Sequence, residues 1–267
     1  MSDTFSADDD VAYGARVRTG IGTLGGAFFV SPQTRQAGKD LGLRGWPTYF
    51  VGRCGVLGPV DADVVAAVCG FFPLSFVRRA WAEGREVDFD QAVEVYLRAC
   101  REWGTLNLGD DRATRRVAEL AQRVVEHSSP MGAPLFAGWR TLPLADETGA
   151  RLAQLLTTLR ELRGAHHLSA VISAGLTPRE AVIAGPGGSA NATFFGWDNV
   201  ELDPARIEAV GVARAEAERR TNRMMADSWS VLDLGERADF ATLLDDLLAR
   251  VTSDSGDAAS VVPGGVR

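Results

Sequence analysis

Long apolar runs are absent from the sequence. No stretch reaches the roughly 18 uninterrupted apolar residues that a membrane-spanning helix needs. Residues 1–10 are polar and acidic, and they lack the basic start and apolar centre of a secretory signal. We therefore expect no membrane span, no signal peptide and no membrane partner.

Cysteine and lysine are scarce. The three cysteines, Cys54, Cys69 and Cys100, are odd in number, far apart and set among apolar residues, so we expect reduced, packed thiols and a cytoplasmic protein. The basic residues are nearly all arginine, with Lys39 the one lysine. Because 35 acidic residues outnumber 28 basic ones and give a net charge of -7, DNA is an unlikely partner.

The common catalytic motifs are missing as well. The sequence has no Walker loop, no Gly-x-Ser-x-Gly elbow, no His-Glu-x-x-His and no paired-cysteine metal spacing. Any chemistry is therefore expected to proceed without a metal and without a cofactor.

What is present is typical of a globular helical protein. The 267 residues are 46% hydrophobic and 24% charged, which allows a substantial core. Strand-like alternation is nearly absent, whereas apolar residues recur at spacings of three and four. This pattern predicts an all-α fold, a multi-helix bundle.

Capping residues and apolar stripes locate individual helices. We expect helices over residues 88–103, 111–127, 146–163, 166–174, 177–184, 204–225 and 236–251. Gly164 is expected to be a break or a tight helix crossing, and residues 185–189 a flexible break.

The domain organisation follows from these helices and from the breaker after residue 127. We expect a disordered tail over residues 1–10 and a second one over residues 253–267. Between them we expect an N-terminal helical subdomain over residues 11–128 and a C-terminal one over residues 129–252, the latter with a helix-turn-helix-like part.

The densest polar cluster lies in an otherwise apolar stretch. It consists of Arg160, Glu161, Arg163, His166 and His167, whose spacing places several of them near one helical face. Such a face suits an anionic substrate, with either histidine as a catalytic base. The alternative is structural: the arginines pair with neighbouring carboxylates, and a histidine is hydrogen-bonded inside the fold.

A second cluster combines aromatic walls with charged groups, as a small-molecule pocket requires. Its candidate substrate-binding residues are Arg44, Trp46, Tyr49 and Arg53, with Trp139 and Arg140 completing the wall, and its candidate catalytic residues are Asp61 and Asp63. The alternative is that Arg53 pairs with Asp61, that the aromatic residues belong to the core, and that both aspartates stabilise a helix N-terminus.

Two segments also carry a family resemblance. One runs from Gly42-Leu43-Arg44-Gly45-Trp46 through Leu57-Gly58-Pro59 to Phe71, and the other contains Leu159-Arg160-Glu161-Leu162-Arg163-Gly164-Ala165-His166-His167. Together they resemble an actinobacterial helix-turn-helix family whose members have about this length and no agreed biochemical role. The family's winged-helix segment looks degenerate here, because residues 198–204 lead straight into a long helix with no evident wing.

The resemblance and the clusters together suggest three functions. The first is a small-molecule-binding protein of actinomycete natural-product biosynthesis, a cofactor-free enzyme of cyclase or lyase type that displaces sulfate or phosphate within an anionic substrate. The second is a helix-turn-helix regulator that senses a small ligand. The third is a stabilising partner that pairs as a homodimer, or as a heterodimer with a related helical subunit, through a stripe around Phe240 and Leu244.

Overall fold

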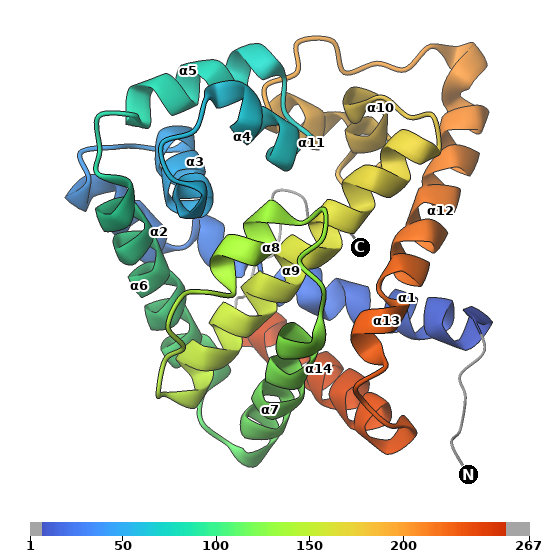
Figure 1. The fold of residues 1–267 in the computed structure, drawn as a ribbon. Coiled ribbons are helices and arrows are strands. Elements are labelled where there is room, and N and C mark those ends of the chain that lie inside the picture. Colours follow the sequence, from blue (N-terminus) through green and yellow to red (C-terminus); the bar gives the residue numbers. More distant parts are fainter. Residues whose placement is uncertain (1–6, 255–267) are drawn as a thin grey trace.

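A computed structural model describes residues 7–254 (Figure 1). Within this range the chain forms fourteen α-helices, three short 3-10 helices and no strand. The prediction of an all-α, multi-helix bundle is confirmed. In the same range, no helix combines the length and the apolar character that crossing a lipid bilayer requires.

The helices follow one another with short connections. The first eight are α1 Ala7–Leu24, α2 Pro32–Asp40, α3 Trp46–Cys54, α4 Ala62–Cys69, α5 Leu74–Gly84, α6 Phe89–Leu108, α7 Arg112–His127 and α8 Pro134–Trp139. The other six are α9 Thr148–Ser173, α10 Pro178–Ile183, α11 Gly188–Phe194, α12 Ile207–Met224, α13 Ala226–Trp229 and α14 Leu234–Asp254. The 3-10 helices are η1 Ala27–Val30, η2 Gly55–Leu57 and η3 Pro204–Arg206.

Side-chain caps fix several helix starts where the sequence predicts them. Asp88 accepts a hydrogen bond from the backbone N–H of Gln91 at the start of α6, and Asp111 caps α7 in the same way. Thr177 and Glu180 form a reciprocal capping box at the start of α10. Each cap satisfies backbone donors that the first helical turn leaves free.

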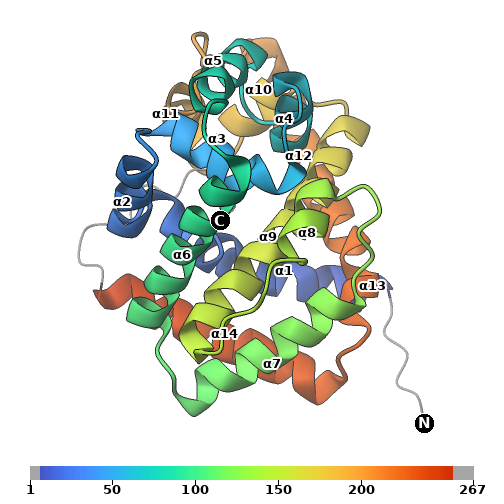
Figure 2. The ribbon, with the colours of Figure 1, turned by 60° about the vertical axis from the view of Figure 1, so that its left-hand side comes forward.

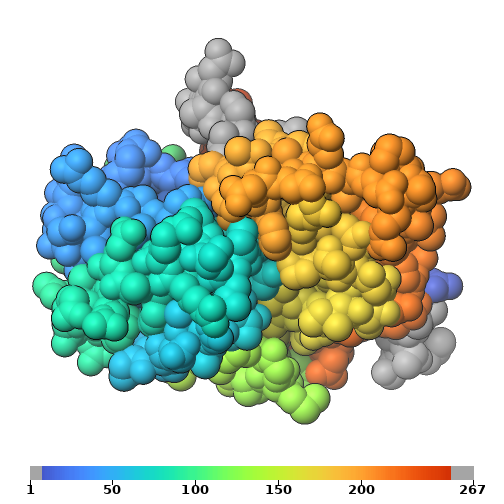
Figure 3. All heavy atoms as spheres, turned by 90° about the horizontal axis from the view of Figure 1, so that it is seen from above, coloured from blue at the N-terminus to red at the C-terminus, as the bar shows by residue number. Residues whose placement is uncertain are grey.

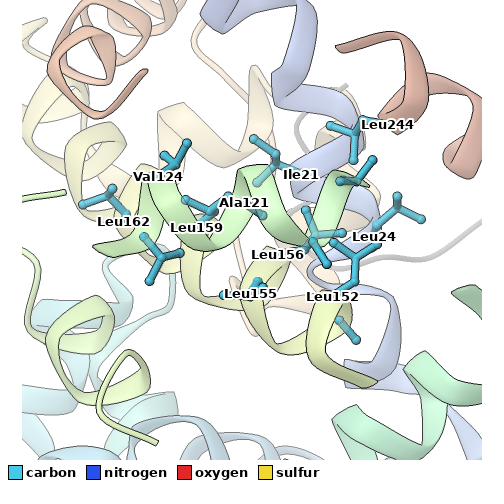
Figure 4. Packing of buried hydrophobic residues seen from close by; sticks show 14 of the residues in the cluster. Ile21, Leu24, Ala121, Val124, Leu152, Leu155, Leu156, Leu159, Leu162 and Leu244 are labelled. Carbon is cyan, nitrogen blue, oxygen red and sulfur yellow. The ribbon is translucent and has the colours of Figure 1, made fainter. Parts of the chain in front are cut away.

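Helix α9 forms the centre of the molecule. It packs against α1, α6, α7, α8 and α12, which surround it in two views (Figures 1 and 2). Its leucines at 152, 155, 156, 159 and 162 are buried and meet Ile21, Leu24 and Val124 of neighbouring helices (Figure 4). A helix that is buried on all sides can present functional groups to an interior cavity.

Three expectations about local structure are wrong. Helix α9 continues through Gly164 without a break, because its packing against five other helices outweighs the cost of about 1 kcal/mol for one glycine. Residues 185–189 are not simply a flexible break, since α11 begins at Gly188. Residues 7–10 belong to α1 and residues 253–254 to α14, so these parts of the two expected tails are helical; positions 1–6 and 255–267 lie outside the described residues.

The expected border between subdomains falls between α7 and α8. Residues from both sides of it share the main core, which extends from Val17 to Leu247. The division into two subdomains stays a prediction. Phe240 and Leu244 are fully buried in this core, so the expected interaction stripe around them is not at the surface.

A second core packs α3, α4 and α5 together. Phe50, Val65, Val77 and Phe195 are among its buried members. This unit meets the C-terminal part of α9, where the rings of Phe71 and His167 lie 5.8 Å apart. In Figure 3, the segment with α4 and α5 lies beside the segment that holds α10 and the C-terminal end of α9. The candidate site lies where these two parts meet.

Candidate functional site

A cavity of about 330 Å³ lies between α3, α4, α8 and the middle of α9. Its apolar walls include Phe71, Phe72, Leu135, Leu168, Ile172 and Phe195. Its polar residues are Tyr49, Arg53, Cys69, Arg160, Glu161, Arg163 and His167. Mostly apolar walls with a few convergent polar groups are typical of small-molecule sites.

The cavity brings together part of both predicted clusters. Tyr49 and Arg53 come from α3, whereas Arg160, Arg163 and His167 come from α9, more than 100 positions later in the chain. These residues lie one turn apart on each helix, so each helix presents one face to the cavity.

Arg53 and Glu161 form a buried, two-pronged ion pair. Arg53 Nε donates to Glu161 Oε1 at 2.8 Å and Nη2 donates to Oε2 at 2.7 Å. The other terminal nitrogen of Arg53 donates to the Tyr49 hydroxyl at 2.5 Å and approaches Cys69 Sγ at 3.6 Å. Burial by itself raises the pKa of Glu161, but the neighbouring guanidinium groups of Arg53 and Arg160 outweigh it and lower that pKa. Arg53 thus organises the wall of the cavity.

Arg160 is only loosely paired. Its guanidinium lies over the ring of Phe29, with Cζ 4.8 Å from the ring centroid. Its Nη1 is 3.5 Å from Glu161 Oε1, an oxygen that already accepts a hydrogen bond from Arg53. Arg160 therefore keeps N–H donors for an anionic group in the cavity.

A second buried network is centred on Glu218 of α12. Its Oε2 accepts a hydrogen bond from Arg163 at 2.7 Å, and Arg18 and Arg214 lie 3.3 and 3.6 Å from its carboxylate. Burial by itself raises the pKa of Glu218, but the arginines outweigh it and lower that pKa. Arg163 Nε and Glu218 Oε1 are buried without a hydrogen-bond partner in the protein. A buried polar atom without a partner carries a desolvation cost, which a polar group of a ligand beside Arg163 would relieve.

His167 is held as a neutral base. Its Nδ1 lies 2.9 Å from the hydroxyl of Thr221, and that hydroxyl donates its own proton to the carbonyl of Ala217. Nδ1 must therefore carry the hydrogen, which leaves the lone pair on Nε2. Burial lowers the pKa of His167 to about 4, so the ring is uncharged near neutral pH. Nε2 lies 3.9 Å from Glu218 Oε1, which is beyond hydrogen-bond distance. A neutral imidazole can accept a proton at this nitrogen.

The low pKa of His167 predicts a pH-dependent stability. The unfolded histidine titrates near 6.5 and the folded one near 4, so the unfolded state binds more protons between these values. The free energy of unfolding should fall as the pH drops through this window, by about 3 kcal/mol in total from this group. Urea unfolding from pH 7 to pH 4 measures it, and His167→Gln should flatten the slope. The exposed His127→Gln is the control; an unchanged slope in His167→Gln would contradict the buried neutral state.

Asp61 and Asp63 lie outside the cavity. Asp61 caps α4 by accepting the backbone N–H of Asp63 at 2.9 Å. Asp63 forms an exposed two-pronged pair with Arg78 at 2.7 and 2.8 Å. The expected pairing of Arg53 with Asp61 is wrong, since Arg53 pairs with Glu161. Both aspartates lie at the start of α4, where a carboxylate stabilises the helix, as the structural alternative expects.

The other predicted residues surround the cavity without lining it. Trp46 packs against Tyr49, Phe50 and Phe72 in the second core. Trp139 is buried and donates its indole N–H to the backbone carbonyl of Arg53 at 3.0 Å. This hydrogen bond helps to fix the backbone position of Arg53.

Three polar candidates also lie outside. Arg44 is exposed, and Arg140 is exposed with a hydrogen bond to the carbonyl of Ser128. His166 directly precedes His167 in α9 but does not line the cavity; it is half-buried, and burial lowers its pKa.

Cys69, Phe29, Glu218 and Thr221 take part in the site but are not among the predicted residues. Glu218 belongs to a helix whose alternating charges predict a solvated face, and its neighbours Arg219 and Arg220 do pair with Glu216 there. One signal in the sequence could have indicated that this helix has a buried face. Val210, Ala217 and Thr221, which are apolar or small, lie along one side of α12, and all three are buried.

Helices α10 and α11 lie within residues 129–252, where we expect a helix-turn-helix-like part. These two short helices pack against each other, and α11 carries no lysine or arginine. Nearby, Arg179 donates to the carbonyl of Asn199 and Arg206 pairs with Glu180 at 2.6 Å. A recognition helix needs donors for bases and cations for phosphates on its exposed face; α11 exposes the hydroxyls of Ser189 and Thr193 but no positive charge.

Fold and cavity together define an all-α bundle with an arginine-lined internal site. The chain belongs to the helix-turn-helix family, whose sequence model matches residues 15–258. Comparisons with curated proteins and with solved structures found no significant match.

Proposed function

We propose that this protein binds an anionic small molecule in the cavity between α3 and α9. The observation that carries the proposal is the charge of the lining. Arg53 and Arg163 are paired with Glu161 and Glu218, whereas Arg160 adds a third cation that is only loosely paired, in a protein whose net charge is -7. The excess positive charge is buried among apolar walls, where an anionic group of a ligand would be strongly favoured.

We further propose that the bound molecule reacts there without a cofactor. Arg160 would hold a departing sulfate or phosphate, and His167 Nε2 would take the proton of an attacking amine or hydroxyl of the same substrate. The result is a cyclisation with loss of the anion, in keeping with a role in natural-product biosynthesis. The positions of Asp61 and Asp63 outside the cavity leave His167 as the proton acceptor of this proposal.

Replacing Arg160 with glutamine is expected to weaken the binding of an apolar anion at least tenfold. The probe is 2-naphthyl sulfate, and binding is measured by isothermal titration calorimetry. Loss of one charge-assisted contact costs about 1.5–3 kcal/mol, which corresponds to a change of that size. The neutral analogue 2-naphthol should bind Arg160→Gln and the wild type equally well.

The matched control is Arg223→Gln, which removes an exposed arginine of α12 far from the cavity lining. Equal loss of sulfate binding in both variants would indicate a general charge effect and contradict the site. Release of inorganic sulfate from amino-alkyl sulfate esters tests the enzymatic part separately. Binding without release from any ester would leave a binding protein and overturn the proposed reaction.

A regulator that binds DNA is the second candidate, and the family description favours it. The charge distribution weighs against it, because α11 has no cationic side chain and several arginines of α12 are paired with Glu216 and Glu218. A ligand-sensing role for the cavity is common to both candidates. We therefore favour the small-molecule proposal, with no nucleic acid as partner.

The stabilising-partner role has less support. The stripe that it required, around Phe240 and Leu244, is occupied by the protein's own core. Pairing as a homodimer or with a related helical subunit would need another surface.

A further inference from the structure

Cys54 and Cys69 meet inside the fold. They are the last residues of α3 and α4, and their sulfur atoms lie 3.5 Å apart. Both side chains are buried, yet Cys69 lines the cavity whereas Cys54 lies behind it. The two thiols therefore differ in access although they touch.

The surroundings of the two thiols shift their pKa values in opposite directions. A hydrogen bond from the Cys54 thiol and the nearby Arg53 guanidinium lower the pKa of Cys69, although burial opposes them. The pKa of Cys54 is raised, because its proton is held in that hydrogen bond. The thiolate is the reactive form of cysteine, so one member of the pair is poised to attack and the other to resolve.

We propose that Cys54 and Cys69 form a reversible dithiol–disulfide site that hydroperoxides oxidise through the cavity. The Cys69 thiolate attacks the terminal oxygen of the hydroperoxide, the O–O bond breaks, and the alkoxide leaves as an alcohol after taking a proton from water. Cys69 becomes a sulfenic acid. The Cys54 sulfur then attacks the Cys69 sulfur, the S–O bond breaks, and hydroxide leaves as water with the Cys54 proton. Two electrons pass from the two thiols to one hydroperoxide.

The disulfide requires only a local movement. The sulfur atoms already lie 3.5 Å apart and must approach to about 2.05 Å to form the bond. Cys100 provides the contrast. It is buried beside Thr157, it does not line the cavity, and burial raises its pKa to about 12.

Peptide mapping tests the proposal directly. Trypsin cuts after Arg53 and Arg78, so both cysteines fall in one peptide, residues 54–78, while Cys100 falls in another. After treatment of the folded protein with tert-butyl hydroperoxide, the 54–78 peptide should lose two hydrogen atoms and resist alkylation. The free thiols measured after denaturation should fall from three to one, and dithiothreitol should restore them. A 54–78 peptide that keeps two alkylatable thiols would overturn the proposal.

Variants assign the two roles. Cys54→Ser should leave Cys69 as a sulfenic acid that dimedone traps, and Cys69→Ser should leave Cys54 unmodified. Cys100→Ser is the control and should form the disulfide as the wild type does. If dimedone labels Cys54 in Cys69→Ser as fast as it labels Cys69 in Cys54→Ser, then access does not depend on the cavity and the assigned roles are wrong. The wild-type peptide readout does not depend on the folding of any variant.

Discussion

Replacement of Glu161 by leucine should lower the free energy of unfolding by about 3–5 kcal/mol. The change leaves the Arg53 guanidinium buried, with its side chain 8% exposed, and removes both of its carboxylate hydrogen bonds. An uncompensated buried charge is far more costly than the pair itself. Urea unfolding followed by circular dichroism measures the effect.

The double variant Arg53→Met/Glu161→Leu distinguishes the stability that the ion pair contributes from the cost of leaving one charge unpaired. Because the charge and its partner are removed together, this variant should recover most of the stability that Glu161→Leu loses. The control is Asp63→Asn, which breaks the exposed pair with Arg78 and should change the free energy of unfolding far less, because solvent screens an exposed pair. A loss in Glu161→Leu no larger than that of the control would show that the buried pair does not form.

Local signals in the sequence were sufficient for most helices. The caps at Asp88, Asp111 and Thr177 act within three residues of a helix start, so their effect does not depend on the rest of the fold. Gly164 shows the limit of such signals. A glycine in a helical pattern indicates a break, but α9 packs against five other helices and remains continuous through Gly164.

The candidate site could be predicted in part, for a similar reason. The spacing of Arg160, Arg163 and His167 places them on one face of a helix, and they do line the same cavity. The partners of these residues could not be predicted, because Glu161 meets Arg53 and Glu218 meets Arg163 only through tertiary packing. Proximity in sequence instead suggested Asp61 for Arg53, and that carboxylate is used as a helix cap.

Gly164→Phe should abolish ligand binding and preserve the fold. Gly164 lies in the middle of α9, lines the cavity, and has no atom within 4 Å of the position where a Cβ would be. A phenylalanine ring there would occupy the space in which we place the ligand. We expect at least a hundredfold loss of affinity for both 2-naphthyl sulfate and 2-naphthol by calorimetry. Gly164→Ala should instead raise the free energy of unfolding by about 0.5–1 kcal/mol, because alanine favours the helix.

Gly211→Phe is the matched control, since Gly211 also lies within a helix, α12, and also has open space around it, but on the exposed surface. It should leave binding unchanged. The two variants test different properties of the cavity. Arg160→Gln removes a positive charge and leaves the cavity open, whereas Gly164→Phe keeps the charge and fills the cavity. Sulfate binding lost in both variants, with 2-naphthol binding lost only in Gly164→Phe, would place the ligand in the cavity with its anionic group at Arg160. If Gly164→Phe binds both probes as tightly as the wild type, the ligand site lies elsewhere.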